Sequence, residues 1–476
     1  MDRGILMHIS SLPSPYGIGN LGKEAFRFAD FLRDSGQTLW QILPLNPTGF
    51  GDSPYQSVSA FAGNPYFVDI DTLVAEGLLT LEETENYFFG ENPSRVDYER
   101  LFFYRFPLLR CAFFRFVSNA EYIRFTEENA FWLDDYALFM AIKEKNHYKS
   151  REDWDLPLKN RDGSVLLQYR KDLKQTIDFY KFIQFKFFEQ WGKLKKYAND
   201  NGIKIIGDMP IYVASDSAEV WAFSELFELD GHKNPESVAC CPPDKCFKNG
   251  QLWGNPLYNW ENMKKDGYLW WRRRFALAQK MYDALRIDHF CGFFEYYSVP
   301  SHAKTAEGAV LKKAPGEDFF SCITKDLHIK IIAENLGKYC PRAEESIKKY
   351  GFCGMDVLQL LTDFKNESAV FSPKNAAYTG THDNDTITGW YESLSTRKRR
   401  AVRKIFGIKR LDNPTQVLIK STLTSGAELA VIPIQDYLGM GSTERMNTPS
   451  TVGGNWLVRI RKEELTPRLS AYIKSF

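Results

Sequence analysis

Three features that often settle a protein's class are missing from this 476-residue sequence: long apolar runs, an excess of one charge, and paired cysteine motifs. The most apolar stretch, residues 101–117, contains three arginines and Pro107. It is therefore too polar to cross a bilayer, and we expect a helix packed in the core. With 61 basic and 60 acidic side chains, the net charge is +1. No long-range field attracts nucleic acid or an anionic membrane, so we expect neither as a partner.

The eight cysteines are scattered and form no C-x2-C pair. Cys240, Cys241 and Cys246 lie near His232, but their spacing is not that of a zinc site. Neither a calcium-binding loop nor a phosphate-binding G-x-x-x-x-G-K-[ST] loop occurs. Scattered thiols without a preceding secretory signal are typical of the reducing cytosol. We therefore expect a cytoplasmic protein that needs no metal or cofactor.

Eight short apolar runs have the length of buried β-strands. The apolar spacings within residues 25–32 and 183–198 are those of one helix face, and a glycine follows each pattern. Strands that alternate with helices predict parallel βαβ units, and eight such units predict a closed α/β barrel, the (β/α)8 or TIM-barrel fold. The predicted strands are residues 4–8, 39–45, 203–208, 284–288, 329–334, 355–360, 376–380 and 429–434.

Two connections between these strands are too long for simple crossovers. Residues 46–202 follow the second strand, and their part from about 73 to 180 has mostly helical patterns. Residues 214–283 follow the third strand and are rich in glycine and proline, so we expect mainly loops there. Connections that follow barrel strands lie at the catalytic face. We therefore expect both to be inserted subdomains that form the walls of the site.

Three acidic residues, Asp288, Glu334 and Asp383, follow the fourth, fifth and seventh runs. Carboxyl ends of barrel strands meet at one rim, and paired carboxylates there are typical of glycosidic-bond chemistry. Arg286 shares a strand face with Asp288, so we expect it to hold Asp288 ionised. Apolar residues before Glu334 are expected to raise the pKa of that carboxyl. Taken singly, each motif fits a salt bridge, a loop or a turn; together they predict a catalytic rim.

Long motifs around these residues resemble one family along nearly the whole chain. They are HISSLPSPYGIGNLG (8–22), WQILPLNPTG (40–49), DSPYQSVSAFAGNPY (52–66), GDMPIYV (207–213), GQLWGNPLY (250–258), ERMN (444–447) and GNW (454–456). The chain closely resembles the 4-alpha-glucanotransferases called amylomaltase or disproportionating enzyme, which form glycoside hydrolase family 77 of the alpha-amylase clan.

The resemblance implies that Asp288 is the nucleophile, Glu334 the acid/base and Asp383 the stabiliser of the transition state. It implies a retaining transfer of an alpha-1,4-glucan segment from a maltooligosaccharide or glucan to the 4-hydroxyl of a glucose or glucan acceptor. For Tyr55 and Trp253, core packing is the alternative to sugar contact. The residues implied to bind substrate are Arg286, His382, Asp208, Tyr55, Ser53, Trp253, Asn255, His289 and Asp244.

Two positions depart from the family pattern. In the loop 238–249, which resembles a family loop over the cleft, Lys245-Cys246 replaces the usual Tyr-Phe, and Cys291 stands where relatives often have arginine. Two other functions stay open. A hydrolase of amylase type would use the same carboxylates, but residues 211–213 lack the Asn-His pair of typical alpha-amylases. A non-catalytic glucan-binding protein would not need all three acids.

Overall fold

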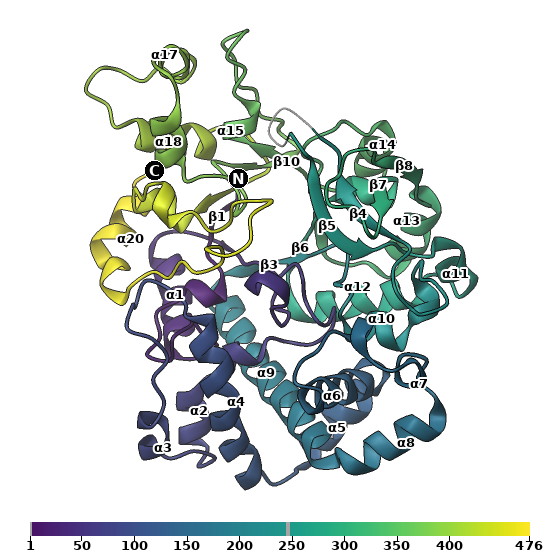
Figure 1. Cartoon of the computed structure of the whole chain (residues 1–476). Helices are drawn as coiled ribbons and strands as arrows, with labels where there is room; N and C mark the ends of the chain where they lie inside the picture. The colour runs from purple at the N-terminus through teal and green to yellow at the C-terminus, as the bar shows by residue number, and fades with distance from the viewer. Residues whose placement is uncertain (1, 244–247) are drawn as a thin grey trace.

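Eight parallel strands form the centre of the molecule (Figure 1). The computed structural model describes residues 2–243 and 248–476. The strand order is β10-β11-β12-β1-β2-β3-β6-β9, and the two outer strands meet at a parallel bridge between Ile332 and Cys353. The sheet thus closes on itself, which confirms the predicted (β/α)8 barrel. The barrel strands are β1 Asp2–Leu6, β2 Leu39–Gln41, β3 Lys204–Met209, β6 Ala284–Ile287, β9 Lys330–Ala333, β10 Gly354–Val357, β11 Asn375–Tyr378 and β12 Leu429–Pro433.

The barrel strands are apolar at successive positions because they have no solvent face. Every residue of β6 and of β12 is buried, as expected for parallel strands with helices outside and packed side chains inside. Gly207 in β3 shows how tight this packing is, since a Cβ there would lie 2.3 Å from the ring of Tyr282. A glycine inside this strand therefore marks a close approach between neighbouring elements.

The connection between β2 and β3 is mostly helical. Figure 1 shows its helices grouped beside the barrel, with α9 running from this group back to β3. The predicted helix over residues 183–198 is part of α9, whose buried residues include Ile183, Phe187, Trp191 and Leu194 on one face. The helices are α2 Ile70–Ala75, α3 Leu81–Glu85, α4 Tyr98–Arg115, α5 Ala120–Glu128, α6 Ala130–Lys145, α7 Leu156–Lys159, α8 Gly163–Asp172 and α9 Lys174–Asp200.

A second, antiparallel sheet was not predicted from the sequence. Its strands are β4 Ser237–Cys241, β5 Gln251–Pro256, β7 Glu295–Pro300 and β8 Val310–Lys313, in the order β5-β4-β7-β8. Two of them come from the connection between β3 and β6, where we expected mainly loops; helices α10 Ala218–Ala222, α11 Trp260–Lys265 and α12 Leu269–Met281 lie there too. β8 has no fully buried residue, so it lacks the apolar signal that marks the barrel strands.

The other helices lie in the connections between the barrel strands and after β12. The N-terminal helix α1, Lys23–Asp34, matches the predicted helix over residues 25–32. None of the helices in the described residues is long and apolar enough to cross a membrane. The remaining helices are α13 Glu317–Ile323, α14 Pro341–Tyr350, α15 Leu358–Leu361, α16 Ile387–Ser393, α17 Thr396–Ile405, α18 Pro414–Leu423, α19 Ile434–Tyr437 and α20 Pro467–Lys474.

Candidate active site

The acidic residues lie where the barrel strands end, and the backbone ladder fixes two of them. Asp288 directly follows β6, and its N–H donates to the carbonyl of Met209 in β3 at 3.0 Å. Glu334 directly follows β9, and its N–H donates to the carbonyl of Ile287 in β6 at 3.0 Å. Both acids therefore prolong the parallel sheet by one residue, which brings them to one rim, as predicted.

Arg286 is the buried cation at the centre of this rim. It is paired in register with Asp208 on the neighbouring strand. Its guanidinium donates to both oxygens of Asp208 at 2.8 Å and lies 3.1 Å from Oδ1 of Asp288. The Arg286 and Asp208 side chains are 3% and 0% exposed, so this pair is shielded from water and from salt. The predicted contact between Arg286 and Asp288 is therefore present.

The net effect on Asp288 is nevertheless opposite to our expectation. Burial raises the pKa of Asp288 to about 7; Arg286 lowers it, but Asp208, Glu334 and Asp383 raise it further. The strand pattern predicted the positive charge of Arg286, which lowers this pKa. It did not predict the three carboxylates that raise the pKa, because they come from other strands and loops. The surroundings of Asp288 therefore raise its pKa rather than lower it.

The expectation that the pKa of Glu334 is raised agrees with its surroundings in the structure. Burial raises the pKa of this carboxyl, while Arg286 and a backbone hydrogen bond partly oppose the shift. The hydrogen bond comes from the N–H of His289, at 2.7 Å from Oε2. His289 adopts a left-handed backbone conformation with φ of 47°, and this strained turn is what aims its N–H at Glu334.

The pKa of Asp383 is shifted in the opposite direction from the pKa values of Asp288 and Glu334. Burial would raise its pKa, but His382 and a hydrogen bond from Asn447 outweigh burial and hold the pKa well below its usual range. His382 Nε2 lies 3.3 Å from Oδ2, and Asn447 Nδ2 donates to Oδ1 at 2.6 Å. Burial likewise opposes a charge on His382, yet Asp383 raises its pKa. Asp383 is therefore a fixed anion at this rim.

A large cleft of about 2400 Å³ opens above the rim. It is lined by residues from the β2–β3 connection, such as Phe50 and Tyr98, and from the β3–β6 connection, such as Cys240 and Trp253. Asp244 and the Lys245-Cys246 departure lie outside the described residues. Among the described residues, no three His, Cys, Asp or Glu side chains are grouped to hold a metal ion. The predicted site residues on this cleft are Ser53, Tyr55, Trp253, Asn255, Arg286, Asp288, His289, Glu334, His382 and Asp383.

Two aromatic platforms, the partly exposed rings of Tyr55 and Trp253, line the same cleft as the acids. The Tyr55 ring stacks on His382 with ring centres 5.0 Å apart, and its hydroxyl donates to Asp208 at 2.7 Å. Trp253 packs edge-on against His289 at 4.9 Å. Partly exposed rings of this kind suit the apolar faces of sugars. The buried carboxylate of Asp208 therefore accepts hydrogen bonds from both Arg286 and Tyr55.

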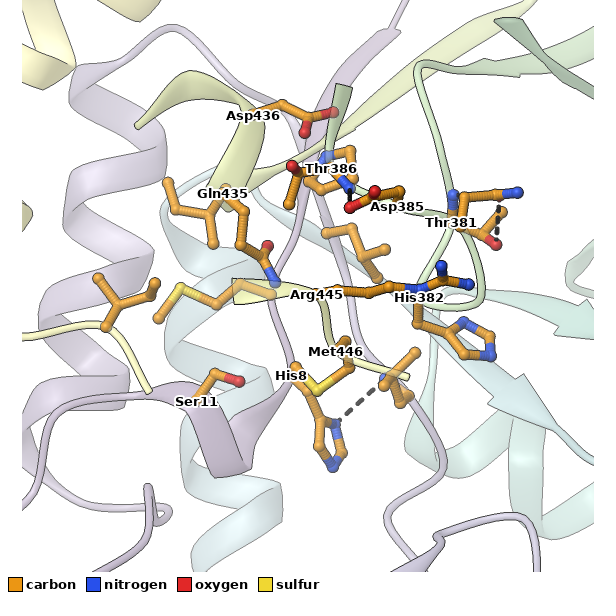
Figure 2. Close-up of a pocket in the computed structure, with 17 residues that line it drawn as sticks. His8, Ser11, Thr381, His382, Asp385, Thr386, Gln435, Asp436, Arg445 and Met446 are labelled. Atoms are coloured by element: carbon orange, nitrogen blue, oxygen red, sulfur yellow. Dashed lines mark hydrogen bonds between the residues drawn. The ribbon is translucent and has the colours of Figure 1, made fainter. Parts of the chain in front are cut away.

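A small cavity of about 30 Å³ lies behind His382, with His8 among its lining residues (Figure 2). His8 Nδ1 accepts the N–H of Leu43 at 3.2 Å. Burial and the charge of His382 lower the pKa of His8 to about 3, so His8 is neutral at neutral pH. Asp383 instead raises the pKa of His382.

Comparison with known proteins identifies the family of this site. A family model described as 4-alpha-glucanotransferase matches residues 7–466. The chain belongs to this 4-alpha-glucanotransferase family. The 4-alpha-glucanotransferase of Streptococcus pneumoniae is 42% identical over 474 residues, which are 98% of this chain and 94% of the relative. That of Thermus thermophilus is 42% identical over 491 residues, 99% of this chain and 97% of the relative.

Solved structures agree with this family assignment. The amylomaltase from Streptococcus agalactiae, determined in complex with acarbose, superimposes with a TM-score of 0.95 and 41% identity, covering 100% of this chain and 98% of that chain. The amylomaltase from Corynebacterium glutamicum has a TM-score of 0.78 at 16% identity, covering 100% and 73%, which shows a shared fold. The predicted 4-alpha-glucanotransferase activity on alpha-1,4-glucans is thereby confirmed.

Some residues of this 4-alpha-glucanotransferase site were missed from the sequence. Asn447 lies in the ERMN motif and Trp456 in the GNW motif, but no role was assigned to either. In the structure Asn447 bonds Asp383, and the Trp456 ring lies 5.8 Å from that of Tyr55. The motifs themselves were the available signal, since polar and aromatic residues in a glycine-containing loop often serve a site.

Proposed function

We propose that this enzyme transfers alpha-1,4-glucan segments by a retaining double displacement, with Asp288 as nucleophile, Glu334 as acid/base and Asp383 as stabiliser of the transition state. The observation that carries the proposal is the pairing of Asp288 and Glu334 at the ends of adjacent strands β6 and β9. Retaining enzymes need two carboxyl groups beside one glycosidic bond. Neighbouring parallel strands supply that proximity.

The charges of the rim support these roles. Asp208 is bound by Arg286. His382 and Asn447 hold the pKa of Asp383 well below its usual range, so this carboxylate stays ionised. Asp288 and Glu334 are the acids whose pKa values are raised, chiefly by burial. One proton shared by Asp288 and Glu334 suits both roles, because the nucleophile must be ionised while the acid is protonated.

In the first step, an Asp288 oxygen attacks the anomeric carbon while the glycosidic C–O bond breaks. The Glu334 proton moves to the leaving oxygen, so the reducing-side fragment departs as an alcohol. In the second step, ionised Glu334 takes the proton of the acceptor 4-hydroxyl, whose oxygen displaces Asp288 and restores both carboxyl groups. Asp383 remains an anion throughout and stabilises the positive charge that develops on the sugar ring.

The cleft supports maltooligosaccharides and longer glucans as donors and glucose or glucans as acceptors. Its volume of about 2400 Å³ exceeds the few hundred to about 1,000 Å³ typical of small-molecule sites. Tyr55 and Trp253 offer stacking surfaces, and the related Streptococcus agalactiae amylomaltase was solved with acarbose. We interpret residues 46–202 and 214–283 as inserted subdomains that wall this cleft, and a cytoplasmic location remains our prediction.

Incubation with maltotriose tests the proposal. Transfer gives glucose and a ladder of longer maltooligosaccharides, with a constant number of reducing ends. Asp288→Asn should abolish both products, whereas Asp363→Asn, the same change on an exposed loop outside the cleft, should leave the ladder unchanged. Glucose and maltose alone, with reducing ends that rise, would instead identify an amylase-type hydrolase.

A further inference from the structure

One buried aspartate holds both ends of the loop that carries His382 and Asp383. This loop connects β11 to α16, and Asp436 lies in α19, directly after β12, the strand beside β11. Its Oδ2 accepts the hydroxyl of Thr379 at 2.5 Å, and its Oδ1 accepts the N–H of Ile387 at 2.8 Å. Thr379 is the first residue after β11 and Ile387 the first residue of α16. A single carboxyl group therefore joins the two ends of the loop.

Both hydrogen bonds are shielded from water. Asp436 is 1% exposed, and Thr379 and Ile387 are fully buried. The first N–H groups of a helix have no partner within that helix, and Asp436 provides one for Ile387. Removal of a buried partner leaves the remaining groups unsatisfied, which costs more than the loss of a bond that water can replace. The two bonds therefore hold both ends of the loop at fixed places on the barrel.

The small cavity of about 30 Å³ lies against the same loop, and Figure 2 shows Asp436 at one end of it and His8 at the other. Side chains beside a void lose van der Waals contacts on that side, so the place of the loop depends there on hydrogen bonds more than on packing. Gln359 and Ser442 also bond the loop, but both act on Asp385, near its end. The loop residues that line the cavity are Thr381, His382, Asn384, Asp385 and Thr386.

We propose that Asp436 is a positioning residue for the transfer reaction, which fixes the place of Asp383 at the rim by joining both ends of its loop. Asp436 lines the small cavity and not the large cleft, so it acts through the loop rather than on the sugar. The inference rests on the role proposed for Asp383, since an anion stabilises a developing charge best from a preorganised position. Misplacement by about 1 Å costs on the order of 100-fold in rate.

Two substitutions of Asp436 in the full chain separate the hydrogen bonds from the charge. Asp436→Ala removes both bonds and should lower kcat/KM for maltotriose roughly tenfold or more. Asp436→Asn can keep both, because its amide oxygen accepts the N–H of Ile387 and its amide nitrogen donates to the Thr379 oxygen. We expect this variant to stay within about threefold of wild type. Thr379→Val removes one bond, should give an intermediate loss, and decides the question if Asp436→Ala does not fold.

Asp356→Ala is the matched control for a general loss of stability. Asp356 is also buried and accepts the N–H of Ser372 at 2.6 Å and the side-chain amide of Asn375 at 3.0 Å. Asn375 begins β11, so these bonds lie at the end of that strand opposite to the loop. We expect Asp356→Ala to lower the urea midpoint and to keep kcat/KM near wild type. In an Asp383→Asn background, Asp436→Ala should add no further loss, because its effect passes through Asp383.

Three results would overturn the inference. Wild-type kcat/KM in folded Asp436→Ala, or in Thr379→Val where the alanine variant does not fold, would show that the loop keeps its place without these bonds. Asp436→Asn as slow as Asp436→Ala would assign the effect to charge. An equal loss in Asp356→Ala would assign it to stability. Failure of the role proposed for Asp383 is distinct, because Asp383→Asn alone would then retain transfer.

Discussion

Asn447 offers a way to measure how much the positioning of Asp383 contributes to the reaction. Its amide donates to Asp383 Oδ1 at 2.6 Å, and its own N–H donates to the carbonyl of His382 at 3.1 Å. Arg445 in turn donates to the carbonyls of Asp383 and Asn447. The side chain of Asn447 thus acts on Asp383, and Asn447→Ala removes this bond while the backbone contacts remain.

The expected magnitude follows from the charge on the acceptor. A hydrogen bond to a charged group contributes about 1.5–3 kcal/mol. If Asn447→Ala removes this much free energy of transition-state stabilisation, kcat/KM for maltotriose falls roughly 10- to 150-fold, at 1.36 kcal/mol for each tenfold change. The unfolding midpoint should change little, because Asp383 is 42% exposed and water replaces the lost donor.

A double-mutant cycle separates a positioning role from a direct one. Initial glucose release from maltotriose is measured for Asn447→Ala, Asp383→Asn and the double variant. We expect the double variant to be no slower than Asp383→Asn, because Asn447 acts through Asp383. Asn366→Ala is the matched control, since Asn366 also donates to an aspartate, Asp363, at 2.7 Å but on an exposed loop.

Two outcomes would refute this reasoning. Wild-type kcat/KM in Asn447→Ala would show that the 2.6 Å bond does not orient Asp383 in the transition state. A further tenfold loss in the double variant would show that Asn447 acts independently, for example on the substrate itself. A comparable loss in Asn366→Ala would point to stability rather than to the site.

Three further predictions concern buried charges. Tyr55→Phe removes the 2.7 Å hydroxyl donor of Asp208 and should lower kcat/KM about tenfold. Single-turnover assays should still show glycosidic-bond cleavage that depends on Glu334. Asp208→Asn should move the acidic limb of the kcat/KM profile to lower pH, because the charge of Asp208 raises the pKa of Asp288, which is about 7. Glu219 is buried, and its pKa is raised from 4.5 to about 7, so ionisation destabilises the fold as pH rises between these values. Urea unfolding should show Glu219→Gln to be more stable than wild type by about 3 kcal/mol at pH 8 and nearly equal at pH 4; an equal difference at both pH values contradicts this.

The barrel was predictable because its strands carry a strong local signal. Most of their residues are buried, and acids follow three of the strands: Asp288 and Glu334 directly after β6 and β9, and Asp383 in the loop after β11. The antiparallel sheet lacked this signal, since β5 alternates between partly buried and exposed residues over its first half and β8 has no buried residue. Its strands are held by pairing with each other, and β4 and β7, which pair in register, lie more than 50 residues apart. Such pairing leaves little trace in a local pattern.

The electrostatics of the site were harder to predict than its residues. Arg286 was correctly placed beside Asp288, because both lie on one strand. The pKa of Asp288 also depends on Asp208, 80 positions earlier in the numbering, and on Glu334 and Asp383 from later segments. A strand pattern identifies one neighbour, whereas a pKa depends on the sum over all charges nearby.

The rim divides into two structural units. Asp288 and Glu334 belong to one unit, since backbone bonds join the ends of β3, β6 and β9. Asp383 belongs to the other, together with His382, Asn447 and the aromatic platform of Tyr55. A change that only moves Asp383, such as Asn447→Ala, leaves its charge in place. It should therefore slow transfer without shifting the acidic limb, whereas a change of charge beside Asp288 should shift that limb. A profile shifted by Asn447→Ala would show that proton sharing and transition-state stabilisation are one coupled property of this rim.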